Sequence, residues 1–496
     1  MNHATTGTPD ASAAPDTGAQ NTGAQDTGAQ DTGAQDTDAG LGHVHFLGLA
    51  GVGVSAVARL MAADGVPISG TDAKELPVLE EFRRGGAAVH VGYRAQNLAA
   101  AEAQLGHPIT AVIASSIAAE GNPEYDEAVR RGLPVLHRSQ GLAALMRTRR
   151  AVAVAGTHGK TTTSSMATVL LEQAGLSPTF AVGANVAGLG VNAATGTGEW
   201  FIAEADESDG SLLNYAPEVG VVTNVEADHL DHYGTAEAVE QVFVDFIERI
   251  TDGGSLIICT DDAGARALLA KVAEPLASRG VSITSYGTGQ DADLRLSSVT
   301  REGGTVREGV EEAQLRLAVP GVHNQLNALA AIAVGRQAGL SLATSVEAIS
   351  HFQGTSRRFE LRGEVSGVRV YDDYAHHPTE VAAVLQAARA SLSADQGQVH
   401  VIFQPHLFSR TAAFAEDFGT ALTAADTVAV LEIYPAREEP IEGVTAALLG
   451  HPVRGAAEAV AEVASAARPG DLIMTLGAGD VTALGADILD ALTARR

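Results

Sequence analysis

The chain has 496 residues, so at ~150 residues per domain it should form two or three domains. Its 60 acidic and 32 basic side chains, a net charge of −28, disfavour binding to nucleic acids or membrane surfaces, because both need clustered Lys and Arg. The single cysteine, Cys259, excludes an intrachain disulfide, and the lack of an apolar run of ~18 residues predicts a cytoplasmic protein without membrane insertion.

The N-terminal segment, residues 1–40, differs from the rest of the chain. Repeats of the pentad DTGAQ fill much of it, with no apolar period and no aromatic side chain. Such a segment cannot bury enough apolar surface to offset the loss of chain entropy. We therefore expect a disordered repeat tail, and it lacks the basic start and apolar stretch of a signal peptide.

Three segments follow, and each opens with an apolar run, a Gly-rich or polar turn and a helix-like pattern. These apolar runs lie at residues 44–49, 151–155 and 368–371. Within each segment, Val- and Ile-rich runs alternate with Ala- and Leu-rich stretches, which predicts parallel sheets covered by helices on both faces. We expect an α/β protein with domains at residues 41–147, 148–355 and 356–496.

A glycine-rich turn follows the first apolar run. Gly48, Gly51 and Gly53 are spaced G-x-x-G-x-G, which lets backbone N–H groups approach a diphosphate at a helix start. Asp72 follows the next strand-like run, where it can bond a ribose or a base. The spacing differs from the G-x-G-x-x-G of dinucleotide-binding proteins. The turn therefore indicates either an NAD(P)-dependent oxidoreductase or a nucleotide-sugar domain, unless its glycines serve only close packing.

The second segment contains a phosphate-binding loop between a strand-like run and a helix-like stretch. Backbone N–H groups there would hold phosphate oxygens, the lysine would lie near the β/γ oxygens, and a Thr hydroxyl would reach Mg²⁺. The chain has only three lysines, so a lysine inside this motif is unlike a solvated surface residue. Val154 replaces the first Walker glycine, which indicates a variant class. The core of the loop is Gly156, Gly159, Lys160, Thr161 and Thr162.

Carboxylates follow further strand-like runs of the second segment. Glu204 ends the run at 200–203, where a nucleotide-hydrolysing enzyme needs a metal ligand beside the phosphate loop. Glu204 is the first choice for this ligand, and Glu207 is the alternative. Asp228 and His229 follow the run at 219–223, and His229 could bind a second metal or orient a phosphate. An Asp- and His-rich turn that caps a helix explains the same spacing equally well.

Ten motifs together resemble those of the Mur ligases, the ATP-dependent amide-forming enzymes of peptidoglycan assembly. The resemblance implies an N-terminal Rossmann-like domain for a UDP-sugar, a central P-loop-type ATPase domain and a C-terminal Rossmann-like domain for the amino acid. Within the family it favours the branch that joins L-alanine to UDP-N-acetylmuramate through an acyl phosphate, with ATP and Mg²⁺, as a monomer or weak homodimer. The motifs are GLAGVGVS, GTHGKTTT, EADESD, NVEADHLDHY, GVHNQLNALAA, RRFE, DDYAHHPTE, FQPHLFSRT, EIYPAREEP and LGAGD.

The resemblance also implies roles for individual residues. Those expected to hold the UDP-sugar are Gly48, Gly51, Gly53, Asp72, Ser115, Ser116 and Arg138. Those expected to bind ATP are Gly156, Thr157, His158, Gly159, Lys160, Thr161, Thr162, His323, Asn324, Asn327 and Arg358. The metal site would comprise Thr161, Glu204 and His229, the amino-acid side His376 and His377, and the catalytic set Lys160, Arg358, Asp373 and His376.

Among these residues, His376 is the expected proton acceptor, because an unperturbed His pKa lies near ~6.5. Two positions depart from the family pattern. No lysine lies between Lys160 and Lys271, so the carbamylated lysine of several Mur ligases is absent, as suits the alanine-adding branch. Tyr93 stands where a His is expected in the first domain.

Three alternative functions remain open from the sequence. The first is a recycling ligase, which attaches a preformed peptide to UDP-N-acetylmuramate. The second is the NAD(P)-dependent oxidoreductase, which leaves the phosphate loop unexplained. The third is a non-catalytic ATP-binding switch, which does not require the paired His376 and His377.

Overall fold

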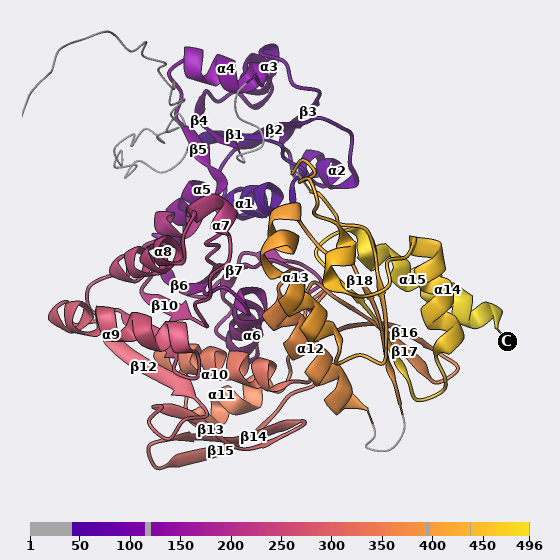
Figure 1. Cartoon of the computed structure of the whole chain (residues 1–496). Coiled ribbons are helices and arrows are strands. Elements are labelled where there is room, and N and C mark those ends of the chain that lie inside the picture. Colours follow the sequence, from indigo (N-terminus) through magenta and orange to yellow (C-terminus); the bar gives the residue numbers. More distant parts are fainter. Residues whose placement is uncertain (1–41, 115–120, 393–396, 437, 496) are drawn as a thin grey trace, which may run out of the picture. The chain divides into compact units, whose positions relative to one another are not determined.

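The computed structural model describes residues 42–114, 121–392, 397–436 and 438–495. The predicted repeat tail and the two serines Ser115 and Ser116 lie outside these residues. Within them, β-strands form successive sheets from residues 43–137, 150–316 and 360–476 (Figure 1). None of the described helices has both the length and the apolar character needed to cross a membrane.

The first sheet is parallel and has the strand order β3-β2-β1-β4-β5. Because the order reverses at β1, the turn after β1 lies where ligands bind in open α/β sheets, at the carboxyl ends of the strands. The strands are β1 (His43–Leu47), β2 (Ile68–Asp72), β3 (Ala88–Val91), β4 (Ile109–Ala114) and β5 (Val135–His137). The helices are α1 (Val52–Ala63), α2 (Pro77–Arg84), α3 (Gln96–Leu105), α4 (Pro123–Arg130) and α5 (Arg138–Met146).

The second sheet has the order β15-β14-β13-β12-β11-β10-β6-β9-β7-β8, with α6 and α10 packed against each other beside it (Figure 1). Its strands are β6 (Arg150–Ala155), β7 (Thr179–Ala181), β8 (Ala193–Ala194), β9 (Trp200–Glu204), β10 (Val219–Val222), β11 (Ser255–Cys259), β12 (Ser282–Gly287), β13 (Leu294–Thr300), β14 (Gly303–Glu308) and β15 (Glu311–Arg316). Its helices are α6 (Lys160–Gln173), α7 (Leu230–Tyr233), α8 (Ala236–Glu248), α9 (Ala263–Ser278), α10 (Val322–Gln337) and α11 (Leu342–Ile349). A 3₁₀ turn, η2, spans Ser211–Asn214.

The third sheet has the order β16-β17-β20-β18-β19. Pro378 is the first residue of the helix that follows β17, a position that suits proline because its fixed φ fits the first helical turn. The strands are β16 (Glu360–Val365), β17 (Val368–Asp373), β18 (Val399–Phe403), β19 (Thr427–Val430) and β20 (Leu472–Leu476). The helices are α12 (Pro378–Ser391), α13 (Phe408–Leu422), α14 (Ala456–Ala466) and α15 (Leu484–Ala494).

Antiparallel strands, which the sequence did not predict, lie at the edges of the second and third sheets. Strands β8, β14, β15 and β16 pair antiparallel to their neighbours. Gly309 and Gly367, with φ of +56° and +78°, lie in the short turns that reverse the chain between β14 and β15 and between β16 and β17. Glycine in a tight turn between two strands is a hairpin signal that an analysis of apolar runs passes over. The third sheet therefore begins at Glu360, before the predicted strand at 368.

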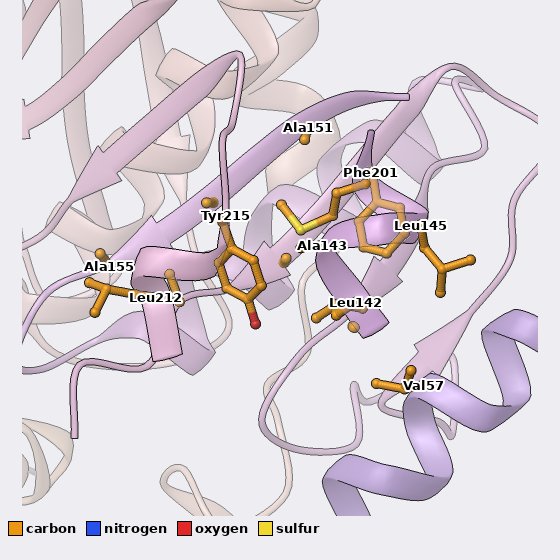
Figure 2. Close-up of a cluster of buried hydrophobic side chains, with 14 of the residues drawn as sticks. Val57, Leu142, Ala143, Leu145, Ala151, Ala155, Phe201, Leu212 and Tyr215 are labelled. Atoms are coloured by element: carbon orange, nitrogen blue, oxygen red, sulfur yellow. The ribbon is translucent and has the colours of Figure 1, made fainter. Parts of the chain in front are cut away.

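A continuous apolar cluster joins the helices of the first sheet to the second sheet (Figure 2). Val57 of α1 and Leu142 of α5 belong to this cluster together with Phe201 of β9. Leu212 and Tyr215, at and just after the turn η2, complete it and are almost fully buried. Since burial of apolar surface stabilises by about 25 cal/mol per Å², this cluster holds the two parts of the chain together.

Candidate active site

The phosphate loop runs from the end of β6 to the first residue of α6, Lys160. Gly156 and Gly159 have positive φ angles of +130° and +82°. A Cβ atom on Gly156 would lie 2.0 Å from Thr223 Oγ1, and one on Gly159 would lie 2.6 Å from Asn327 Oδ1. Both close contacts and both backbone angles therefore require glycine. The Asn327 side chain of α10 thus lies directly against the loop at Gly159.

Lys160 is held inside the phosphate loop by three oxygen atoms. Its Nζ donates to the carbonyl oxygens of Gly156 and Thr157, at 2.8 and 3.1 Å, and lies 2.7 Å from Glu207 Oε1. Burial raises the pKa of Glu207 to about 7, although the positive charge of Lys160 acts in the opposite direction. Glu207 Oε2 is buried without a hydrogen-bond partner. Glu207 is thus the direct ion-pair partner of the loop lysine.

Thr161 and Glu204 form the pair of oxygen donors that the sequence predicts as a metal site. Thr161 Oγ1 donates to Glu204 Oε1 at 3.0 Å, and the backbone N–H of Gly183 donates to Glu204 Oε2 at 2.7 Å. A Cβ on Gly183 would lie 2.6 Å from Glu204 Oε2 and 2.8 Å from Thr161 Oγ1. Because Mg²⁺ takes hard oxygen ligands, these residues fit the ion, and glycine at 183 leaves space beside them.

His229, the other predicted metal-site residue, lies at the start of α7 with a positive φ of 55°. Its Nε2 is 3.7 Å from Glu207 Oε1 and 3.7 Å from Asp228 Oδ2. The first-choice prediction groups His229 with Glu204 in the metal site. In the structure, His229 lies beside Glu207, the alternative ligand. Glu204 contacts Thr161, whereas Glu207 faces Lys160 and His229.

The loop after β17 contains the predicted acceptor-side residues. Asp373 accepts hydrogen bonds from the backbone N–H groups of Phe359 and Ala375, at 2.7 and 2.8 Å. Burial raises the pKa of Asp373 to about 6, and the Arg358 charge opposes this. His376 Nδ1 donates to the carbonyl oxygen of Tyr374 at 3.0 Å, which leaves Nε2 as an acceptor.

The expectation that His376 has an ordinary pKa is wrong. Burial lowers the pKa of His376 to about 3, and the nearby Glu380 carboxylate only partly opposes this. A neutral imidazole of such low basicity is a poor acceptor for the proton of an amine. His376 therefore presents a neutral Nε2 that can accept a hydrogen bond.

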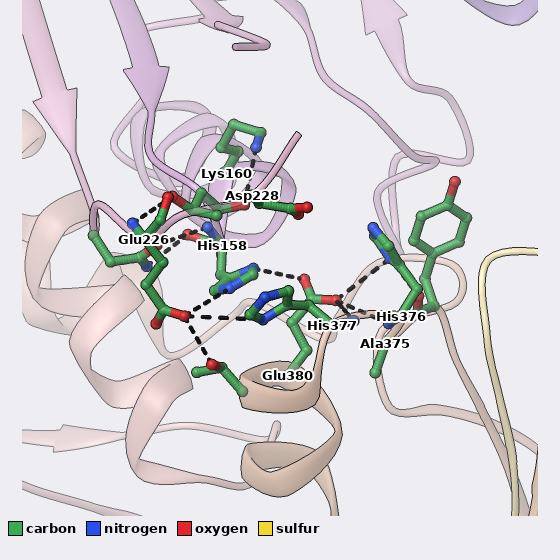
Figure 3. A network of polar contacts seen from close by, with 12 residues as sticks. His158, Lys160, Glu226, Asp228, Ala375, His376, His377 and Glu380 are labelled. Atoms are coloured by element: carbon green, nitrogen blue, oxygen red, sulfur yellow. Dashed lines mark hydrogen bonds and ion pairs between the residues drawn. The ribbon is translucent and has the colours of Figure 1, made fainter. Parts of the chain in front are cut away.

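Glu380, which the sequence analysis missed, connects the predicted site residues (Figure 3). Its carboxylate accepts from the backbone N–H groups of His376 and His377, at 2.9 and 3.3 Å, at the start of α12. Its Oε1 lies 3.3 Å from His158 Nδ1 and 3.9 Å from Arg358 Nη1. Glutamate at the third position of a helix is the sequence signal that would have indicated this role.

His158 lies between two carboxylates. Its Nε2 is 3.6 Å from Glu226 Oε2, and its Nδ1 faces Glu380. Burial alone would lower the pKa of His158, but the interactions with Glu226 and Glu380 raise it to about 9. The phosphate loop thus contacts the acceptor-side loop through this side chain.

A buried ion pair joins the motif after β10 to helix α13. Arg410 Nη2 lies 3.0 and 3.3 Å from the two carboxylate oxygens of Asp228. Burial opposes ionisation, but Arg410 holds the pKa of Asp228 well below its usual range. Arg410 belongs to the motif FQPHLFSRT, whose spacing alone does not indicate this ion pair.

Most of these groups line one cavity of about 800 Å³. Its lining includes Thr157, Gly159, Lys160, Thr161, Glu204, Asp228, His229, Arg358, His376 and Arg410. Predicted ATP-site, metal-site and acceptor-side residues that are not among its lining are Gly156, His158, Thr162, Glu207, His323, Asn324, Asn327, Asp373 and His377.

At the predicted adenine side, His323 and Asn324 lie in the first turn of helix α10, which begins at Val322. Asn324 Nδ2 donates to the carbonyl oxygen of Pro320 at 2.7 Å, and burial lowers the pKa of His323 to about 4. Pro320 lines a further cavity of about 830 Å³, which shares Arg358 with the first. Arg358 thus lies at the point where the two cavities adjoin.

The glycine turn after β1 is supported by its predicted neighbours. Asp72 Oδ2 accepts a hydrogen bond from the backbone N–H of Ala50 at 2.9 Å, so this carboxylate stabilises the backbone of the turn. Arg138 lies against Gly53, where a Cβ would come within 3.2 Å of its Cδ. The Tyr93 hydroxyl lies 3.8 Å from the Cβ position of Gly48. The structure therefore brings Gly48, Gly53, Asp72 and Arg138 together.

The phosphate loop with adjacent oxygen donors, in an α/β chain of three successive sheets, defines a phosphate-transferring nucleotide-dependent enzyme. Profiles described as Mur ligase family, catalytic domain, Mur ligase middle domain, and Mur ligase, glutamate ligase domain match residues 43–150, 154–335 and 357–479. The chain belongs to the Mur ligase family. Membership of this family confirms the predicted α/β fold with three domains. It also excludes the alternative that the chain is an NAD(P)-dependent oxidoreductase.

Several relatives are more than half identical to this chain. The UDP-N-acetylmuramate–L-alanine ligase of Paenarthrobacter aurescens is 55% identical, over 91% of this chain and 97% of its own length. The protein of the same name from an Arthrobacter species is 56% identical, over 92% of this chain and 96% of its own length.

Solved structures with a similar fold share about a quarter of the sequence. The UDP-N-acetylmuramate-alanine ligase of Thermotoga maritima has a TM-score of 0.69 and 26% identity, over 92% of this chain and 100% of its own. A murein peptide ligase of Psychrobacter arcticus has a TM-score of 0.64 and 25% identity, over 91% of this chain and 99% of its own.

Proposed function

We propose that this chain is a cytoplasmic enzyme that joins L-alanine to the carboxylate of UDP-N-acetylmuramate, with conversion of ATP to ADP and phosphate, in peptidoglycan precursor synthesis. The observation that carries the proposal is the single cavity lined by Lys160, Thr161, Arg358 and His376, because it joins phosphate-loop and acceptor-side groups. The relatives named UDP-N-acetylmuramate–L-alanine ligase, at 55% and 56% identity, support the choice of substrates.

The chemistry requires an activated carboxylate. A carboxylate oxygen is a poor leaving group, so an amine does not displace it at neutral pH. Transfer of the γ-phosphoryl group of ATP to the sugar-borne carboxylate forms an acyl phosphate and releases ADP. The amine then attacks the acyl carbon, phosphate leaves with the former carboxylate oxygen, and the nitrogen loses a proton.

The phosphoryl transfer depends on position and on neutralised charge. Lys160 would contact the β/γ oxygens from inside the loop, and Arg358 would approach the γ-phosphoryl group from the adjoining segment. Thr161 and Glu204 would hold Mg²⁺, with Glu207 and His229 beside them. Bound there, Mg²⁺ would offset negative charge on the phosphate oxygens.

The amine step depends on orientation of L-alanine. His376 Nδ1 is bonded to the Tyr374 carbonyl, so Nε2 can accept a hydrogen bond from the amine and direct its lone pair toward the acyl carbon. The low basicity of His376 fits this orienting role better than proton abstraction. The proton would then leave to another acceptor or to water.

The deciding experiment is phosphate release from ATP with UDP-N-acetylmuramate and each of the twenty amino acids in turn. We expect release that depends on both UDP-N-acetylmuramate and L-alanine, and loss of at least about a hundredfold in Lys160→Ala. Lys271→Ala is the matched control, because Lys271 is exposed on α9 and forms an ion pair with Glu240, away from the phosphate loop.

The same assay separates the rival functions. Release with a tripeptide but not with L-alanine would identify a recycling ligase, and release without UDP-N-acetylmuramate would favour an ATP-binding switch. Absence of phosphate with every substrate present, or full activity of Lys160→Ala, would refute the proposal.

A further inference from the structure

Three side chains of types that can bind metals, two imidazoles and one carboxylate, meet beside the phosphate loop (Figure 3). His158 belongs to the loop, Glu226 follows β10, and His377 immediately precedes α12. One ligand atom from each lies within 4.8 Å of the others. Glu226 Oε2 is 3.6 Å from His158 Nε2 and 3.9 Å from His377 Nδ1. Residues far apart in the sequence thus place two imidazoles and one carboxylate around one point.

The ring nitrogens at this point lack ordinary partners. His377 is only 4% exposed, yet neither of its ring nitrogens makes a hydrogen bond, and His158 Nε2 makes none either. Their distances to Glu226 exceed the hydrogen-bond range. Buried polar atoms almost always have a partner, so three such nitrogens in one cluster indicate a ligand.

Neighbouring side chains orient His158 and Glu226, as outer contacts do for the ligands in protein metal sites. Glu380 Oε1 lies 3.3 Å from His158 Nδ1, so Nδ1 keeps its proton, and Nε2 is the ring atom that faces the cluster and can bind a metal once its own proton is lost. Thr379 Oγ1 donates to Glu226 Oε2 at 2.8 Å and orients that carboxylate. A carboxylate behind a ligating imidazole is the usual outer contact of a protein metal site.

We propose that His158 Nε2, Glu226 Oε2 and a ring nitrogen of His377 bind one Zn²⁺ ion. Two imidazole nitrogens and a carboxylate oxygen suit Zn²⁺, whereas Mg²⁺ prefers oxygen ligands alone. The ion takes the place of the Nε2 proton of His158, which is released to solvent. It connects the phosphate loop to the start of α12 and thereby fixes the distance between the ATP-binding and acceptor-side loops.

The proposal is tested on the full chain after removal of metal with a chelator. Equilibrium dialysis against Zn²⁺ in excess Mg²⁺ should leave one Zn²⁺ per chain. Glu380→Ala should weaken Zn²⁺ binding by about 10–100-fold through loss of the outer contact, while Glu380→Gln should keep most of the affinity, because its amide oxygen still accepts from Nδ1. His377→Ala should weaken it more than Glu380→Ala, because it removes a direct ligand.

Two further variants make the test independent of folding defects. Glu226→Gln removes a ligand while it keeps the side-chain volume and an acceptor for Thr379. His107→Ala removes an exposed histidine elsewhere and should leave Zn²⁺ binding unchanged. With Co²⁺ as a spectroscopic probe, the visible absorption of nitrogen-ligated Co²⁺ should appear in the unmodified chain and disappear in His377→Ala and Glu226→Gln. Failure to retain Zn²⁺ against Mg²⁺, or equal retention by folded Glu226→Gln, would overturn the site.

Discussion

At the scale of single residues, Gly183 shows how one missing side chain shapes the ATP site. Its backbone N–H donates a hydrogen bond to the Glu204 carboxylate. A methyl group on its Cα would enter the space beside the Thr161 hydroxyl and the Glu204 carboxylate. Its φ is not in the left-handed region, so a larger residue is excluded by contact and not by backbone strain. This position therefore allows a test of the oxygen pair without removal of either oxygen.

We predict that Gly183→Ala lowers the rate of ATP-dependent phosphate release by about a hundredfold, because a Cβ 2.6 Å from Glu204 Oε2 must displace that carboxylate. The thermal unfolding midpoint should change little. Gly455→Ala is the matched control, since nothing lies within 4 Å of its Cβ position. Steady-state kinetics of the two variants check this, and an unimpaired Gly183→Ala enzyme would show that Glu204 has no part in the reaction.

The environment of a side chain also decides its chemistry at this scale. His158 and His376 are the same residue type a few ångströms from the same carboxylate, that of Glu380. Two carboxylates hold the pKa of His158 at about 9, whereas burial takes that of His376 to about 3. An ordinary His pKa is therefore a poor guide to either residue.

At the scale of elements, strand β1 combines an apolar and a polar side. His43 Nε2 and His45 Nδ1 both lie 2.7 Å from Ser69 Oγ of β2. His45 Nε2 lies 2.9 Å from Glu124 Oε2, and Asn97 Nδ2 donates to Glu124 Oε1 at 2.5 Å. The sequence predicts residues 44–49 only as an apolar run, and this pattern does not indicate the buried polar network around His45. It links β1 and β2 to helices α3 and α4.

We predict that Glu124→Gln makes the unfolding free energy less sensitive to acid. Burial would raise the pKa of Glu124, but hydrogen bonds from His45, Asn97 and the Arg94 N–H hold it below the ordinary 4.5. A lowered folded pKa stabilises the native state above pH ~4.5, and this contribution is lost as the pH falls through the folded pKa. Urea unfolding across that window should give a smaller decrease for the variant than for the unmodified chain.

At neutral pH, the same variant should cost about 1–3 kcal/mol, because a buried charged acceptor is replaced by an amide. Glu312→Gln, in an exposed pair with Arg307, is the control and should alter neither quantity measurably. A pH profile of Glu124→Gln parallel to that of the unmodified chain would contradict the assignment.

At the scale of the whole molecule, contacts between distant segments assemble the site. The apolar cluster of Figure 2 joins the first two sheets. Asp228 and Arg410, 182 residues apart, form a buried ion pair between the second and third. Loss of one partner from such a pair leaves an uncompensated charge in a poorly solvated place.

We predict that Arg410→Ala lowers the unfolding free energy by about 3–5 kcal/mol. Arg307→Ala, which breaks an ion pair whose two side chains are each 48% exposed, should cost less than about 1 kcal/mol. Urea denaturation of both variants provides the measurement. Equal losses would mean that the buried pair has no special role in holding the segments together.

The sequence alone determined the glycine turns, the phosphate loop, the strand that ends at Glu204 and the strand that precedes Asp228. Each depends on residues adjacent in the chain, whose backbone and spacing carry the signal. Only the tertiary structure decided that Glu207 pairs with Lys160, that Glu380 joins His158 to the acceptor loop, that Arg410 neutralises Asp228 and that His376 is weakly basic. These features depend on burial and on charges brought close from distant segments, which local spacing does not encode.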